Sequence, residues 1–162
     1  MSLHSFQKFS RYWFLILLCL GIGFLSSRYM TPTTMIWYQS LNLAPLTPPA
    51  AVFMPVWTFL YILMGISAAL VWDKVSPRPF AFQLVANGAW SFFFFYLKMP
   101  WLAFIDILIL LFLILWTIKV FAKESKMAAG LLVPYLLWTA FATYLNGYTV
   151  FVSNTLPNGA LF

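Results

Sequence analysis

Charged residues are scarce in this sequence. Only 7% of its 162 residues are Asp, Glu, Lys or Arg, whereas a soluble domain has about 25%. Hydrophobic residues make up 64% of the chain, far more than a water-facing surface and a core of this size require. The composition excludes an ordinary soluble domain and predicts an integral membrane protein.

Groups with reactive chemistry are almost as rare. The one histidine, His4, lies in the N-terminal tail, and the three acidic residues, Asp73, Asp106 and Glu124, are far apart in the sequence. A metal site needs several such ligands together, and a hydrolase needs a nucleophile beside a base. The sequence therefore predicts no catalytic residue, no metal site and no haem held by an axial histidine. The single cysteine, Cys19, excludes an internal disulfide.

Long apolar runs account for most of the chain. Because lipid offers the backbone no hydrogen-bond partner, a segment that crosses it must be a helix or a strand of a closed barrel, and continuous runs of about 20 residues fit helices. The sequence predicts an all-α fold, a single domain over residues 1–162 that is an integral membrane bundle of five transmembrane helices. The predicted spans are residues 12–29, 50–72, 80–97, 100–118 and 127–152.

The first span has a second interpretation. Lys8 and Arg11 precede its apolar stretch, and the small pair Ser26 and Ser27 follows it. This arrangement is also typical of a secretory signal peptide, which is removed from the mature protein. Cleavage there would leave four spans.

Residues 31–49 join the first two spans and contain four prolines and no charge. Proline lacks an amide proton and disfavours helix at the residue before it, so we expect a long loop with at most one short helical turn around residues 35–41. Loops of this length are often functional. The connection at residues 98–100 is short, which predicts that the third and fourth spans form an antiparallel pair.

Basic residues are distributed unevenly among the connections. With five spans, seven of the nine Lys and Arg residues fall on one side of the membrane, and only Arg28 and Lys98 fall on the other. The positive-inside rule then predicts a cytoplasmic N-terminus, with the long loop and the C-terminus outside. The basic residues form no cluster, so the net charge of +6 does not indicate nucleic-acid binding.

Aromatic residues make up 21% of the chain, and most of the tryptophans lie near span ends, where an interfacial belt would place them. Trp57, Trp90 and Trp138 instead lie deep within their spans. Steps of three and four residues place aromatic, small and amide side chains on one face of each of three spans: Trp57, Tyr61 and Gly65; Asn87, Trp90 and Phe94; Trp138, Ala142 and Asn146.

These three faces have two interpretations. A polar side chain at membrane depth is costly unless it is hydrogen-bonded, so Asn87 and Asn146, and Asp106 if it lies deep enough, should point into the bundle. They would then either join the helices to one another or surround a cavity. A cavity with aromatic walls and a few polar groups suits a large, flat, mostly apolar ligand.

A set of short motifs extends from residue 37 to residue 148. Its members are Trp37-Tyr38, Pro48-Pro49, Pro55-Val56-Trp57, Leu60-Tyr61, Met64-Gly65, Asn87 with Trp90, Asp106, Pro134-Tyr135, Trp138, Phe141-Ala142 and Leu145-Asn146. At this spacing the set resembles the translocator protein family, which comprises the tryptophan-rich sensory proteins of bacteria and the peripheral-type benzodiazepine receptors of mitochondria.

The resemblance implies a five-helix bundle, often a homodimer, that binds porphyrins such as protoporphyrin IX and related apolar ligands in a pocket under the first loop. The porphyrin would be a ligand and not a cofactor. The ligand-binding residues that the resemblance implies are Trp57, Tyr61, Asn87, Trp90, Phe94, Trp138, Ala142 and Asn146.

Two departures from the family pattern bear on the ligand. Leu43-Ala44 stands where relatives commonly have a Lys-Pro pair, which leaves a loop contact to an acidic ligand group without its lysine. No basic residue follows Lys126, so the C-terminal cholesterol motif of animal members is incomplete, which favours a bacterial type in a bacterial membrane.

The leading hypothesis is a membrane receptor, sensor or transporter for porphyrins. One alternative is an enzyme that degrades porphyrins with light or an oxidant, with Trp57 and Trp138 as redox-active neighbours of the ring. The sequence offers that enzyme no acid–base pair. A second alternative is a structural membrane partner that binds no ligand.

Overall fold

Helices make up nearly all of the chain. The computed structural model describes residues 3–152, with side chains from residue 7 onward, and this part contains no strand, as the all-α prediction requires. The side chain of His4 and residues 153–162 lie outside the described part. The helical elements are α1 (Leu3–Ser27), α2 (Pro32–Ser40), α3 (Ala50–Val71), α4 (Arg78–Ser91), the π-helical η1 (Phe92–Tyr96), α5 (Pro100–Ala122), α6 (Lys126–Leu131) and α7 (Val133–Phe151).

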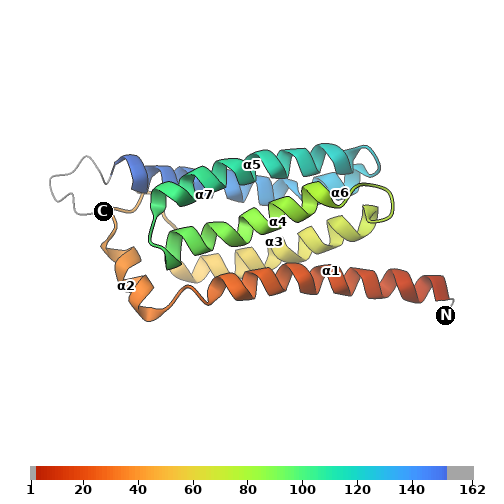
Figure 1. The fold of residues 1–162 in the computed structure, drawn as a ribbon, viewed down its shortest axis with the longest axis horizontal. Helices are drawn as coiled ribbons and strands as arrows, with labels where there is room; N and C mark the ends of the chain where they lie inside the picture. The colour runs from red at the N-terminus through yellow and green to blue at the C-terminus, as the bar shows by residue number, and fades with distance from the viewer. Residues whose placement is uncertain (1–2, 153–162) are drawn as a thin grey trace.

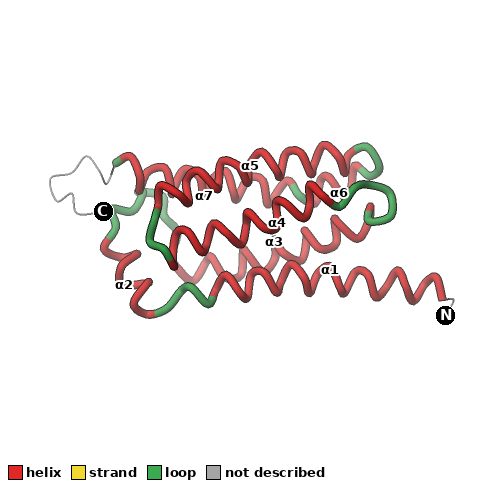
Figure 2. The backbone as a smooth tube through the Cα atoms, in the orientation of Figure 1, coloured by secondary structure: helices red, strands yellow, loops and turns green. Residues whose placement is uncertain are grey.

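The long helices lie side by side in one bundle, and α2 lies at the end of it opposite the N-terminus (Figure 1). α1 packs mainly against α3, α4 against α5, and α5 against α7. Most of the connections lie at the two ends of the bundle (Figure 2). The predicted antiparallel pairing across residues 98–100 is confirmed, because α4 with η1 runs back along α5.

Four helical segments are long and apolar enough to cross a membrane: Gln7–Ser27, Ala50–Val71, Pro100–Ala122 and Lys126–Phe151. They correspond to the predicted spans 12–29, 50–72, 100–118 and 127–152. The last of these is divided at Leu132 into α6 and α7, because Pro134 has no N–H to continue the helical ladder. The predicted span 80–97 corresponds to α4 and η1, which have 14 and 5 residues and are each too short to cross a membrane alone, so the count of five spans stays a prediction.

The segment from residue 31 to residue 49 is more helical than its prolines suggested. α2 covers nine residues from Pro32, where only a short turn near residues 35–41 was expected. Pro32 occupies the start of the helix, where its missing N–H breaks no hydrogen bond. Thr31 acts as the N-cap, since its Oγ1 accepts a hydrogen bond from the Thr34 amide at 3.2 Å. Proline here favours the helix that it was expected to prevent.

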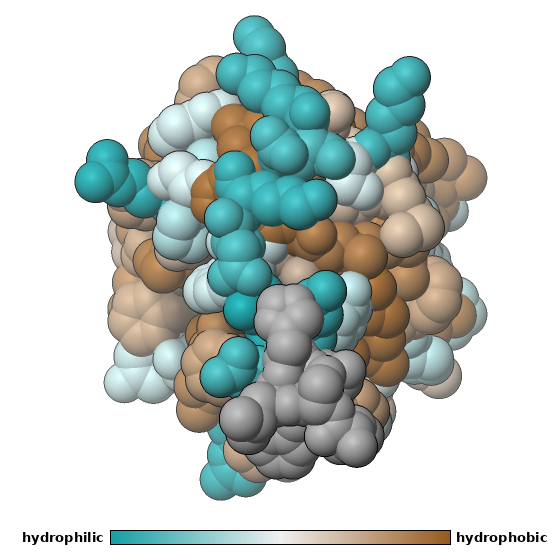
Figure 3. Space-filling view, turned by 90° about the vertical axis from the view of Figure 1, so that its right-hand side faces the viewer, coloured by the Kyte–Doolittle hydropathy of each residue, from teal (hydrophilic) through white to brown (hydrophobic). Residues whose placement is uncertain are grey.

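Polar and apolar residues separate along the bundle. Figure 3 faces the end that holds the start of α1 and the connections from α3 to α4 and from α5 to α6, and hydrophilic residues gather there. Arg11 of α1 forms an ion pair with Asp73, just after α3, near this end. The flanks carry exposed apolar side chains such as Phe14 and Phe112, which is the surface that a lipid bilayer requires.

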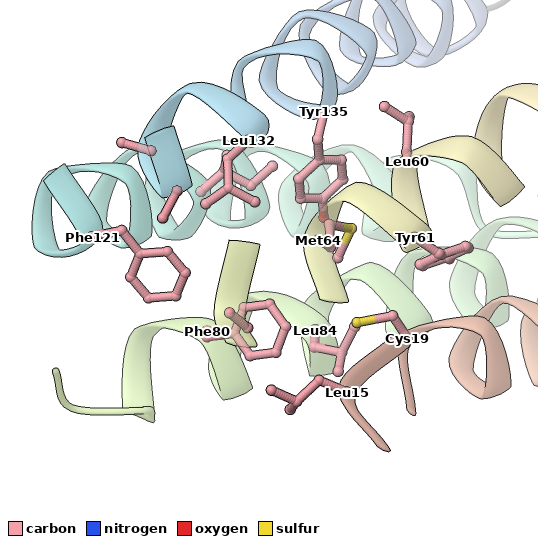
Figure 4. Packing of buried hydrophobic residues seen from close by; sticks show 14 of the residues in the cluster. Leu15, Cys19, Leu60, Tyr61, Met64, Phe80, Leu84, Phe121, Leu132 and Tyr135 are labelled. Carbon is pink, nitrogen blue, oxygen red and sulfur yellow. The ribbon is translucent and has the colours of Figure 1, made fainter. Parts of the chain in front are cut away.

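The half of the bundle nearest this polar end has a solid core. Leu15 and Cys19 of α1, Met64 of α3 and Leu84 of α4 are buried together between their helices (Figure 4). Gly65 of α3 lies so close to α1 that an added Cβ atom would be 2.5 Å from the Cα atom of Ile16. Small residues at such crossings let helix backbones approach closely, which is how membrane helices gain packing contacts.

Candidate functional site

The half of the bundle next to α2 contains a cavity of about 440 Å³. This volume lies within the range of about 300–1,000 Å³ that is typical of small-molecule sites. Side chains from α1, α3, α4, η1, α5 and α7 form its walls. Met35 and Tyr38 of α2, with Leu43 and Thr47 of the loop that follows, border it at the end of the bundle.

Every residue of the predicted ligand-binding set lines this one cavity. Four of them are buried and the others are partly buried. The set comprises Trp57, Tyr61, Asn87, Trp90, Phe94, Trp138, Ala142 and Asn146. Gly65 belongs to the predicted face on α3 but not to this set, and it lies against α1. The structure brings these residues together, and their contact with a ligand stays a prediction.

The side chain of Asn87 joins three helices. The Tyr61 hydroxyl of α3 donates a hydrogen bond to Asn87 Oδ1 at 2.6 Å, and Asn87 Nδ2 of α4 donates to the Tyr135 hydroxyl of α7 at 3.0 Å. All three side chains are buried. Because hydrocarbon cannot satisfy these polar groups, each depends on the others for its hydrogen bonds.

A second amide network surrounds Asn146. The Trp90 indole N–H of α4 donates to Asn146 Oδ1 at 3.1 Å, and Asn146 Nδ2 of α7 donates to the Pro100 carbonyl oxygen of α5 at 3.0 Å. Both predicted amides therefore join helices while they also line the cavity. Asp106 is half-buried, has one enclosed oxygen without a partner among the described residues, and does not line the cavity.

Stacked aromatic rings form one wall. Trp90 stacks on Phe94, with ring centroids 5.1 Å apart and planes at 21°. Phe94 and Phe95 are neighbours in the sequence and both line the cavity from η1, a π-helical turn of the kind that is frequent at functional sites. Tyr38 of α2 covers these two rings at centroid distances of 6.2 Å and 5.9 Å. Burial raises the pKa of the Tyr38 hydroxyl.

The wall formed by α7 includes a residue that the sequence analysis missed. Thr139 lines the cavity with 1% of its surface exposed, and its hydroxyl has no hydrogen-bond partner among the described residues. It lies four residues after Tyr135 and three before Ala142, so helical spacing alone places it on the predicted face. The predicted faces were defined by aromatic, small and amide side chains, so they did not include a threonine. Phe53, also missed, packs edge-on against Trp138 with centroids 5.9 Å apart.

Charge is absent from the described residues that line the cavity. Lys98 is exposed, lies outside the lining and holds its Nζ 5.9 Å from the centroid of the Trp37 ring. Within residues that the structure describes, no three His, Cys, Asp or Glu side chains lie together as a metal site would need. The chemistry available in the cavity is ring contact and hydrogen bonding by neutral groups.

The chain resembles known proteins over most of its length. Residues 15–152 match the model of the TspO/MBR family, a range that includes all of the cavity walls. The chain is 43% identical over 138 residues to the tryptophan-rich protein TspO of Chlorobaculum tepidum, which covers 80% of this chain and 87% of that protein.

A second relative, the tryptophan-rich protein TspO of Archaeoglobus fulgidus, is 36% identical over 145 residues, 86% of this chain and 94% of that protein. The translocator protein of Ovis aries is 36% identical over 133 residues, 76% of this chain and 79% of that protein. The resemblance found in the short motifs is thus confirmed over most of the sequence, and the chain belongs to the TspO/MBR family.

Proposed function

We propose that this protein is a membrane receptor, sensor or transporter that binds porphyrins and related flat, apolar molecules in the cavity beside α2. The observation that carries the proposal is the meeting of Trp57, Trp90 and Trp138, from three helices, around one cavity. Aromatic contacts contribute about 0.5–1.5 kcal/mol per ring pair beyond the burial of area. A flat, conjugated ligand can make several of them at once.

The hydrogen-bond networks support this proposal because they hold the walls in place. Asn87 fixes Tyr61 relative to Tyr135, and Asn146 fixes the indole of Trp90. Walls that are already ordered lose little conformational entropy when a ligand arrives, which favours binding.

We also propose that α4 and η1 together form a fifth span. Their 14 and 5 residues would extend about 28 Å as a helix, close to the thickness of about 30 Å of the hydrocarbon core. The polar side chains Gln83, Asn87 and Ser91 are buried in the bundle, while Phe82 and Val85 are exposed. The polar side chains of this segment therefore face the bundle, and apolar side chains face outward.

Because the five helices would cross a bacterial membrane, the two ends of the bundle would lie on opposite sides of it. The polar end in Figure 3, with the N-terminus, would face the cytoplasm by the positive-inside rule. α2 and the cavity would then lie toward the outside. Assembly into a homodimer stays a prediction.

Titration of the purified protein with porphyrins in darkness tests the proposed binding. We expect saturable quenching of tryptophan fluorescence, and a smaller quenching amplitude in Trp138→Phe, because Trp138 borders the cavity. Trp116→Phe is the matched control, since Trp116 is exposed on α5, and it should keep the wild-type midpoint. If no porphyrin gives saturable quenching, the proposal is wrong and the structural-partner alternative is favoured.

Illumination of the same samples tests the enzymatic alternative. Trp57 and Trp138 line the cavity as that alternative requires, but the described lining residues include no acid–base pair. We expect the porphyrin absorbance to be stable. An absorbance that decays with the wild type and persists with Trp138→Phe would instead establish degradation.

A further inference from the structure

The walls of the cavity are uncharged, but a basic residue lies at its edge. Ser27 and Met30 line the cavity and are exposed, so the chain between them passes along a place where the cavity meets the surface. We call this edge, residues 27–30 and the neighbouring α2, the rim of the cavity. Arg28 lies in it, directly after α1, with an exposed side chain. Its guanidinium forms no ion pair with any of the described residues.

Lys98 is a second basic residue near the rim, in the turn between η1 and α5. Its Nζ lies 5.9 Å from the centroid of the Trp37 ring of α2, and that ring packs edge-on against Phe94, a lining residue, at 5.7 Å. Lys98 has a φ of 54°, in the left-handed region that glycine adopts more easily. A lysine kept in this conformation indicates that its side chain has a role.

The basic residues at the two ends of the bundle have different surroundings. At the polar end, Arg11 pairs with Asp73, and Glu124 follows α5. Near α2, neither Arg28 nor Lys98 has a carboxylate partner among the described residues. In the orientation proposed above, both residues also lie on the side of the membrane where basic residues are disfavoured. The rim is therefore a positively charged edge around an uncharged cavity.

This arrangement suits a ligand with an apolar body and an acidic edge. A carboxylate buried in the cavity would lose its hydration and meet no cation, so the acidic edge has to stay outside. At the rim, an arginine can donate two parallel hydrogen bonds to a carboxylate, and a lysine can contribute a point charge. An uncharged ligand of the same shape gains nothing from these two residues.

Building on the proposed function, we propose that Arg28 and Lys98 recognise carboxylate groups that a flat ligand keeps at the rim while its ring system is buried in the cavity. The ligand class is a polycyclic compound with acid groups along one edge. Because both side chains are exposed, each makes a modest contribution to affinity, and salt weakens it.

Two porphyrins that share a ring system and differ at their acid groups test the inference. Protoporphyrin IX and its dimethyl ester are titrated into the full chain in nonionic detergent at low salt and in darkness, after the micelle partition of each has been measured without protein. Arg28→Gln and Lys98→Gln should each raise the Kd of the diacid about three- to fivefold, and the double variant about tenfold. The Kd of the ester should not change.

Two further variants separate charge from other effects. Arg28→Lys keeps the charge and should recover most of the affinity for the diacid. Arg78→Gln is the matched control, because it removes an exposed arginine at the polar end, and it should leave both Kd values as they are. Salt of about 1 M, where the screening length is about 3 Å, should remove most of the difference between Arg28→Gln and the wild type.

Three outcomes would contradict the inference, and they differ in what else they overturn. If neither porphyrin saturates the protein, porphyrin binding is wrong and the inference fails with it. If both saturate and the two glutamine variants bind the diacid as the wild type does, the basic residues only anchor the protein at the lipid head groups. If a variant weakens diacid and ester equally, it has changed the cavity and not the recognition of charge. In the last two cases porphyrin binding stands.

Discussion

The two halves of the bundle are both apolar, yet one is solid and the other is hollow. Toward the polar end, Leu15, Met64 and Ile114 are completely buried. Toward α2, the same helices separate around a cavity of about 440 Å³. Hydrophobicity does not explain the difference. In the solid half, Gly65 lets α3 approach α1 closely, whereas in the hollow half large rings such as that of Trp57 line the cavity.

Hydrogen bonding differs between the halves as well. In the solid half, Ser67 donates its hydroxyl to the Ala128 carbonyl oxygen at 2.6 Å, a single hydrogen bond between α3 and α6. In the hollow half, the networks around Asn87 and Asn146 each connect three helices. A cavity removes packing contacts from its walls, so directed hydrogen bonds are needed there to keep the helices in place.

The largest loss of stability is expected from a substitution in the solid half, at Gly65. In Gly65→Ala the new Cβ would lie 2.5 Å from Ile16 Cα and 2.7 Å from Ile16 N, so α1 must move. We expect a loss of about 1–3 kcal/mol, measured as a lower thermal midpoint in detergent. Gly21→Ala is the control, because nothing lies within 4 Å of its added Cβ, and its helix propensity should improve. Equal midpoints for the two variants would contradict the close crossing.

In the hollow half, Asn87→Leu removes two hydrogen bonds at similar side-chain volume. We expect a loss of about 1–2 kcal/mol, again as a lower thermal midpoint, because the hydroxyls of Tyr61 and Tyr135 lose their shared partner. Gln39→Leu changes an exposed amide on α2 and should leave the midpoint in place. An unchanged midpoint in Asn87→Leu would show that the network does not hold the cavity walls.

A smaller effect is expected at α2, which covers the hollow half. Tyr38→Ala removes the ring over Phe94 and Phe95. Bound porphyrin should dissociate several-fold faster in stopped-flow fluorescence, by about the loss of one or two aromatic contacts. Ile36→Ala, at an exposed position of the same helix, should leave the rate as it is. Equal dissociation rates in these two variants would show that α2 does not retain the ligand.

The smallest effect is expected at the polar end. Arg11 pairs with Asp73, but their side chains are 27% and 66% exposed, and such ion pairs contribute about 0–1 kcal/mol. Arg11→Gln should lower the thermal midpoint slightly at low salt. The difference should disappear as the salt concentration rises, because salt screens exposed charges. A large loss that persists in high salt would mean that this end depends on the ion pair more than on packing.

Much of the fold could be predicted from the sequence. Membrane thickness sets the length of each apolar run, and helical spacing sets which residues share a face. The length of the apolar runs fixes the spans, and steps of three and four residues place Trp57, Trp90 and Trp138 on inward faces. The start of α2 could not be predicted by treating proline only as a helix breaker. It depends on a cap at Thr31, which a proline at the first helical position completes.

The sequence could not predict whether the polar groups of the cavity walls already have hydrogen-bond partners within the protein. Asn87 and Asn146 were expected to orient a ligand or to join helices, and the choice depends on where the phenols of Tyr61 and Tyr135 and the indole of Trp90 lie in three dimensions. The same holds for Thr139. Its helical position could be read from spacing, but the lack of a partner for its hydroxyl is a tertiary feature.

The central claim is that the hollow half holds a flat ligand, and a matched pair of alanines on α7 tests it most directly. Ala142 lines the cavity, whereas Ala140 is exposed on the same helix. Porphyrin titration followed by tryptophan quenching should show that Ala142→Phe, which fills the cavity with a ring, raises the Kd by about tenfold or more while the protein stays folded. Ala140→Phe should bind as the wild type does. Identical saturation curves for the two variants would contradict the account.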